Sequence, residues 1–212
     1  MRSPARALLR LLAGLAITLA AAAHSGAAGA QAAAQPPPPA AAAARGCLPA
    51  RNGYLRARIR GALNLDINWR NAELECAGDE RPDGSAIRVI FAGPKGPGGH
   101  RLRMVFGIAS AREGRNGHEL PTNLTVILEG DGRLFATRGD DHCTVDTLRQ
   151  EPLGGGGVSA RSYRVVARGF CILPASTLNN AQRILVSSFD FAGRATFGAQ
   201  PPAQLPAIGN RF

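Results

Sequence analysis

The sequence predicts an all-β protein: a single antiparallel β-sandwich or barrel-like domain of about nine short strands with two disulfides. Three observations carry this prediction. Apolar and polar residues alternate through most of the middle of the chain, and a period of two places the apolar ones on one face of a sheet. Val, Ile, Phe and Thr are frequent in these runs, which favours strand over helix. Clusters rich in Gly, Pro and Asn separate the runs, as short turns require.

The first alternating run, residues 54–60, shows the pattern. Leu55, Ala57 and Ile59 fall on one side of the predicted strand, and three arginines fall on the other. Residues 175–183 are the only segment that favours a helical turn. Eight further alternating runs are expected to form strands, and they cover residues 65–69, 87–91, 102–108, 124–128, 134–137, 143–148, 163–170 and 184–191.

Residues 1–30 are expected to be a secretory signal peptide. Three arginines form a basic start, an uncharged apolar run of 13 residues follows at 11–23, and Ala28-Gly29-Ala30 supplies small residues for cleavage. The apolar run is shorter than the ~20 residues that span a bilayer. We therefore expect no transmembrane segment after cleavage, with an uncleaved anchor as the alternative.

The two ends of the remaining chain are poor in side chains that could form a core. Residues 31–45 consist mainly of Ala and Pro, with four consecutive prolines at 36–39, and are expected to be a disordered linker. Residues 199–212 contain three more prolines and are expected to be a disordered tail. The β domain is therefore expected at 46–198, a length for which about 70% of the chain surface is buried on folding.

All four cysteines lie within the expected domain. An even number behind a signal peptide predicts two disulfides and an oxidising compartment, which is the periplasm or the cell exterior. Four cysteines allow three pairings. Pairing in chain order closes the shortest loops, so we expect Cys47–Cys76 and Cys143–Cys171, each worth roughly 3–4 kcal/mol. The spacings do not fit a tetrahedral zinc site, and we expect no metal and no cofactor.

The chain is basic, with a formal net charge of +10 that comes almost wholly from arginine. Export makes genomic nucleic acid an unsuitable partner, so an anionic envelope polymer or another envelope protein is expected. Arg56, Arg58 and Arg60 share one face of the first predicted strand at spacings of about 7 Å. Arg101 and Arg103 form a shorter strip on another strand. These five are the candidate binding residues, and a solvated face that protects a strand edge is the alternative.

The residues that could support catalysis are scattered. The sequence at 140–142, Asp-Asp-His, could bind metal or move protons, but we expect a polar loop leading into Cys143. Glu73 and Glu75 are expected to share a strand face as two solvated acids. His100 and His118 fall among loop residues, and no Gly-x-Ser-x-Gly nucleophile motif is present.

These observations favour an exported, non-catalytic protein that binds an anionic envelope component or has a structural role there. Two alternatives stay open. One is a secreted or periplasmic hydrolase whose triad or carboxylate site is assembled from distant loops, since such sites are defined by geometry rather than by spacing. The other is a scaffold protein that associates with itself, which requires an exposed apolar patch.

Overall fold

A computed structural model describes residues 46–154 and 161–198. The predicted signal peptide, linker and C-terminal tail lie outside these ranges. No helix in the described ranges is long and apolar enough to cross a membrane. The ranges contain two 3-10 turns, η1 (Asn71–Glu73) and η2 (Pro97–Gly99), and eleven strands: β1 (Tyr54–Gly61), β2 (Leu65–Arg70), β3 (Glu75–Glu80), β4 (Ala86–Ala92), β5 (Arg101–Ala109), β6 (Gly117–Glu129), β7 (Arg133–Ala136), β8 (Cys143–Pro152), β9 (Arg161–Cys171), β10 (Ala175–Ser176) and β11 (Arg183–Phe197).

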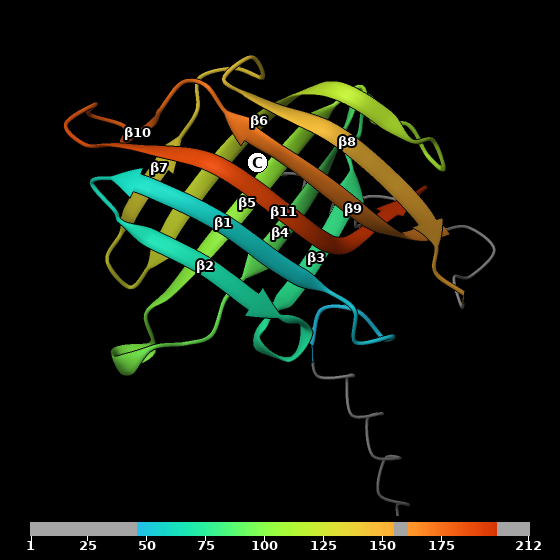
Figure 1. Cartoon of the computed structure of the whole chain (residues 1–212), viewed down its shortest axis with the longest axis horizontal. Coiled ribbons are helices and arrows are strands. Elements are labelled where there is room, and N and C mark those ends of the chain that lie inside the picture. The colour runs from blue at the N-terminus through green and yellow to red at the C-terminus, as the bar shows by residue number, and fades with distance from the viewer. Residues whose placement is uncertain (1–45, 155–160, 199–212) are drawn as a thin grey trace, which may run out of the picture. The chain divides into compact units, whose positions relative to one another are not determined.

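The strands form two packed layers (Figure 1). The front layer has the order β2-β1-β11-β9-β8, and the back layer has the order β3-β4-β5-β6-β7. Neighbouring strands are antiparallel within both layers. In Figure 1 the strands of the back layer cross behind those of the front layer. The predicted antiparallel fold is therefore confirmed.

Three connections join the layers at their margins. The long strand β6 pairs with β8 through its first half and with β7 through its second half. The short strand β10 links β7 to β11. A single parallel pairing, Thr196 with Asp79, joins β11 to β3. Strand pairing thus connects the margins of the two layers. The fold has the packed core of a sandwich, and its hydrogen bonding runs from one layer to the other as in a barrel.

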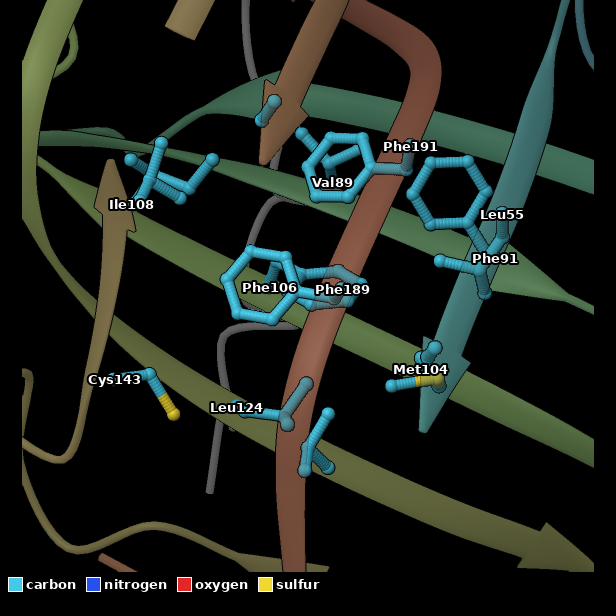
Figure 2. Packing of buried hydrophobic residues seen from close by; sticks show 14 of the residues in the cluster. Leu55, Val89, Phe91, Met104, Phe106, Ile108, Leu124, Cys143, Phe189 and Phe191 are labelled. Carbon is cyan, nitrogen blue, oxygen red and sulfur yellow. The ribbon is translucent and has the colours of Figure 1, made fainter. Parts of the chain in front are cut away.

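Phenylalanine side chains from both layers meet in the core (Figure 2). The ring of Phe106 in the back layer lies 4.9 Å from that of Phe189 and 4.8 Å from that of Phe191, both in the front layer. Phe91 lies 5.0 Å from Phe191. All four are fully buried, and such pairs contribute about 0.5–1.5 kcal/mol each beyond their buried area. Gly193 permits this packing, because a Cβ there would lie 2.6 Å from the Phe91 ring.

The nine predicted strands all form, and the structure adds β3 and β10. The sequence Glu-Cys-Ala-Gly-Asp-Glu of β3 has no apolar alternation, so its strand state follows from pairing with β4. The expectation of a helical turn at 175–183 is wrong. Ala175 and Ser176 instead pair with β11 and β7, because the backbone there closes the margin between the two layers.

Both expected disulfides are present. Cys47–Cys76 joins the segment before β1 to β3, and Cys143–Cys171 joins β8 to β9 at directly opposite positions. No cysteine in the described part of the chain is free. The first bond therefore attaches the start of the domain to the back layer. The second joins the two strands at one margin of the front layer.

The buried side chain of Asn71 also holds the start of the domain. Its Oδ1 accepts hydrogen bonds from the backbone N–H of Leu48 at 2.8 Å and of Gly53 at 3.0 Å. Its backbone carbonyl accepts a further bond from the N–H of Cys47 at 3.1 Å. Buried backbone N–H groups need such acceptors, so Asn71 supplies what the irregular chain between Gly46 and Gly53 cannot supply itself.

Candidate functional site

The predicted arginine strip lies on the outer face of the front layer. Arg56, Arg58 and Arg60 are exposed, while the residues between them are buried. Arg60 donates to both carboxylate oxygens of Asp66 on β2, at 2.8 and 3.0 Å, and Arg58 lies 3.4 Å from the same carboxylate. The hydrogen bond from Arg60, supported by the charge of Arg58, holds the pKa of Asp66 below its usual range. One carboxylate therefore partly neutralises two of the three predicted arginines.

Arg56 has a different environment. Its guanidinium lies 5.1 Å from the centre of the Tyr54 ring, an arrangement worth about 0.5–1 kcal/mol at an exposed site. The Tyr54 hydroxyl in turn donates to Asp190 of β11 at 2.7 Å. Burial, followed by this hydrogen bond, raises the pKa of Tyr54. Arg56 is thus held in place by an aromatic ring, and it forms no ion pair with the residues that the structure describes.

Strand pairing extends the strip across the whole front layer. Asp190 lies between Arg56 on one side and Arg168 on the other. Further along the layer, Arg194 lies opposite Arg164. We call the resulting surface the arginine face, and its cationic residues are Arg56, Arg58, Arg60, Arg70, Arg149, Arg164, Arg168 and Arg194.

Sequence reasoning missed most of this surface. Arg164 and Arg168 occupy outward positions of a predicted strand, so the alternating pattern could have identified them, whereas Arg70, Arg149 and Arg194 lie in parts of β2, β8 and β11 beyond the predicted ranges. Their proximity to β1 depends on β11 and β9 following β1 in the layer. Those strands begin more than a hundred residues later in the chain, so the sequence pattern alone does not predict this order.

Four carboxylates share the arginine face. Asp66 contacts Arg58 and Arg60 as described above. Glu151 accepts from Arg164 at 2.8 Å, and Asp190 lies 3.7 Å from Arg168. Asp146 is the fourth. Arg56, Arg70, Arg149 and Arg194 form no ion pair within the described residues, so the face as a whole carries positive charge.

The second predicted strip lies on the opposite side of the domain. Arg101 and Arg103 project from β5 on the outer face of the back layer, because Met104 and Phe106 point inward. Arg103 donates to Glu129 at 2.7 Å, and Arg101 contacts Glu129 and also Glu75, the latter at 2.9 Å. Arg101, and then Arg103, hold the pKa of Glu129 below its usual range. This strip is engaged in ion pairs within the domain and does not extend the arginine face.

The outer face is hollowed at the level of Arg58 and Arg168. The hollow has a volume of about 520 Å³, and its charged lining consists of Arg56, Arg58, Arg168, Asp66, Asp146 and Asp190. Ser187, Ser188 and Phe170 also line it, and the remaining lining residues are Ala57, Ile67, Gly169 and Phe189. Unlike the rest of the face, its lining has equal numbers of positive and negative side chains.

Two β-bulges shape this hollow. Arg58 pairs with Ser188 while the next residue pairs with Val186, which leaves Ser187 as the extra residue of β11. On β8 the register likewise shifts between Val145 and Thr147, which leaves Asp146 extra. A bulge turns an additional side chain toward one face. As a result Ser187 and Ser188 are both exposed, although they are adjacent in a strand.

The residues considered for catalysis do not converge. The segment Asp140–His142 is a loop that leads into Cys143, as expected, and the closest approach of His142 to Asp141 is 3.9 Å. His100 lies in a loop, as expected, 2.8 Å from Asp131, whereas the expectation of a loop at His118 is wrong, because His118 lies in β6 opposite Thr147. Within the described ranges no group of three or more His, Cys, Asp or Glu residues could hold a metal ion.

Glu73 and Glu75 are both exposed, as expected of solvated acids, but the expectation that they share a strand face is wrong. Glu73 lies in η1 and not in a strand, and it accepts a hydrogen bond from the backbone N–H of Arg70 at 2.8 Å. Glu75 begins β3 and contacts Arg101. Glu73 ends η1 and Glu75 begins β3, so they do not form a pair on one strand face.

Comparisons with protein-family models, with curated proteins and with solved structures find no match to this chain. We therefore infer a function from the geometry of the arginine face and its hollow.

Proposed function

We propose that this protein is an exported, non-catalytic binding module whose arginine face holds an anionic polymer of the cell envelope. The observation that supports the proposal most directly is the cross-strand arrangement of arginines around β11. Arg56, Arg149 and Arg194 contribute charge to this face without an ion pair in the described part of the chain.

The chemistry of arginine suits such a ligand. Its planar guanidinium binds carboxylate and phosphate through two parallel hydrogen bonds, which a lysine ammonium does not do. Neighbouring strands lie about 4.8 Å apart, and alternate residues along a strand lie about 7 Å apart. The face therefore presents cationic groups at short, regular intervals, and a polymer with repeated anionic groups can contact several of them at once.

The disulfides support a location outside the cytosol. Two bonds with no free cysteine in the described residues are typical of the periplasm or the cell exterior, because reducing systems keep cytosolic thiols free. Sequencing the N-terminus of the mature protein tests export: cleavage after Ala30 agrees with the proposal, and recovery of the intact N-terminus from the cytosol contradicts it.

Binding is tested by retention of the mature protein on an immobilised polyanion at several salt concentrations. The variant R56S/R149S/R194S removes three charges that make no ion pair within the described domain. We expect about tenfold weaker binding and a weaker dependence on salt, because each ion pair with the polymer contributes roughly 0.2–1 kcal/mol and is screened by ions.

The matched control is R81S/R115S/R138S, which removes the same charge from loops outside the arginine face. We expect its retention to stay close to that of the wild type. Equal losses in both triple variants would show that net charge alone causes retention. Unchanged retention of the face variant would show that the polymer binds elsewhere.

A further inference from the structure

We infer that the hollow on the arginine face binds a hydroxyl-bearing sugar unit, so that the polymer is an acidic polysaccharide. The inference rests on the proposed function and adds the chemical class of the ligand. The hollow differs from the rest of the arginine face in its balance of charges, in its bulged backbone and in its apolar surface.

The charges of the hollow argue against a ligand whose polar groups are all anionic. Asp66, Asp146 and Asp190 line it together with three arginines. A phosphate or carboxylate placed there would be attracted by the guanidinium groups and repelled by the carboxylates. A sugar hydroxyl both donates and accepts hydrogen bonds, so it can donate to an aspartate and accept from an arginine. The volume of about 520 Å³ lies within the range of roughly 300–1,000 Å³ for small-molecule sites.

The bulges add hydroxyl and carboxylate groups that a regular strand would not provide. Ser187 and Ser188 both face outward, and Asp146 is the extra residue of β8. A hydroxyl can reorient to serve as donor or acceptor, which suits a ligand with hydroxyl groups in several directions. Asp146 makes no hydrogen bond or ion pair with other described residues, so its carboxylate is available to a ligand.

Phe170 gives the hollow an apolar surface. It occupies an outward position of β9, two residues after Arg168, and 38% of its surface is exposed. A sugar ring has an apolar face of C–H groups beside its polar rim. The Phe170 ring can cover that face while the charged side chains bind the hydroxyl groups, and acid groups on neighbouring sugars then reach the free arginines further along the layer.

Three probes of similar chain length distinguish these contributions in calorimetric titrations of the mature protein. Oligogalacturonate carries sugars and carboxylates, maltohexaose carries sugars alone, and polyphosphate carries charge alone. We expect the tightest binding to oligogalacturonate. Binding of polyphosphate as tight as that of oligogalacturonate would overturn the sugar assignment and leave the proposed function intact. Binding of maltohexaose as tight as that of oligogalacturonate would instead overturn the proposed role of the arginine face.

The variant D146N gives the sharpest test, because we expect it to change the affinities for the two charged probes differently. It removes a carboxylate acceptor from the hollow and makes the face more positive. We expect affinity for oligogalacturonate to fall about fivefold, whereas affinity for polyphosphate stays equal or rises. The control D83N makes the same change in the β3–β4 turn, where Asn also suits an Asx turn, and we expect it to change neither affinity.

Tighter binding of both charged probes to D146N would overturn the inference, since it would show that Asp146 acts only by repulsion. A second variant, F170S, tests the apolar surface without changing the charge. We expect it to weaken binding of oligogalacturonate and not of polyphosphate. Absence of binding for both charged probes, with wild-type protein, would contradict the proposed function itself.

Discussion

Arg194 of β11 lies directly opposite Arg164 of β9, so two cationic side chains meet across one pair of strands. Glu151 compensates Arg164 alone, at 2.8 Å. The Nε atoms of both arginines are buried and have no hydrogen-bond partner within the described residues. Like charges at opposite positions destabilise a sheet, and a buried donor without an acceptor costs about 1–3 kcal/mol. This part of the arginine face therefore lowers the stability of the fold that carries it.

Replacing Arg194 should separate stability from binding. We expect R194M to raise the free energy of unfolding by about 1 kcal/mol, because it removes the like-charge contact and a buried unsatisfied donor while keeping an apolar stem. Retention on the polyanion should fall at the same time. Urea unfolding and retention measure the two effects, with R88M as a control that breaks the ion pair with Asp79 on the back layer. A less stable R194M would contradict this account.

The disulfides should each contribute substantially to stability. The linked residues are 29 and 28 positions apart, and loops of this length are worth roughly 3–4 kcal/mol in the chain-entropy model. We expect C47A/C76A and C143A/C171A each to lower the free energy of unfolding by about 3 kcal/mol. Urea unfolding in oxidising and reducing buffer measures this. A wild-type curve that is unaffected by reduction would show that the bonds contribute little.

Asn71 should be important for the start of the domain. N71A leaves the buried N–H groups of Leu48 and Gly53 without their side-chain acceptor, and we expect a loss of about 3 kcal/mol. N71D keeps an Oδ1 acceptor in nearly the same place and should lose less. Thermal unfolding compares the two variants. Equal losses would indicate that packing of the side chain matters more than its hydrogen bonds.

The ion-pair cluster of the back layer should make stability depend on pH in acid. Arg101 and Arg103 lower the pKa of Glu129 in the folded state. A lowered folded pKa stabilises the protein at neutral pH, and this contribution disappears as the pH falls through the folded pKa. We expect E129Q to have a lower melting temperature at pH 7 and a smaller further decrease in acid. E119Q is the control, since Glu119 forms no ion pair within the described residues. An identical decrease of the melting temperature in acid for E129Q and wild type would refute the role of Glu129.

The local pattern predicted most of the strands for a simple reason. In strands such as β1 and β5, one face is buried and the other contacts solvent, so burial imposes the period of two on the sequence. The strands β3 and β10 escaped prediction because hydrogen bonding to neighbours fixes them and apolar burial contributes little. Their main partners, β4 and β11, are the next strands along the chain, but these two short segments carry no alternation of apolar and polar residues from which to predict them.

The chain alone determined that Arg56, Arg58 and Arg60 share a face, and the short loops of chain-order pairing favoured the two disulfides that form, although four cysteines allow three pairings. Only the tertiary structure decided that the strip of Arg101 and Arg103 faces the other way, and that Arg168 and Arg194 join the first strip. The physical reason is that side-chain direction follows from the backbone within one strand, whereas strand order follows from how both layers bury their apolar faces together. A surface built across several strands is a product of that global packing.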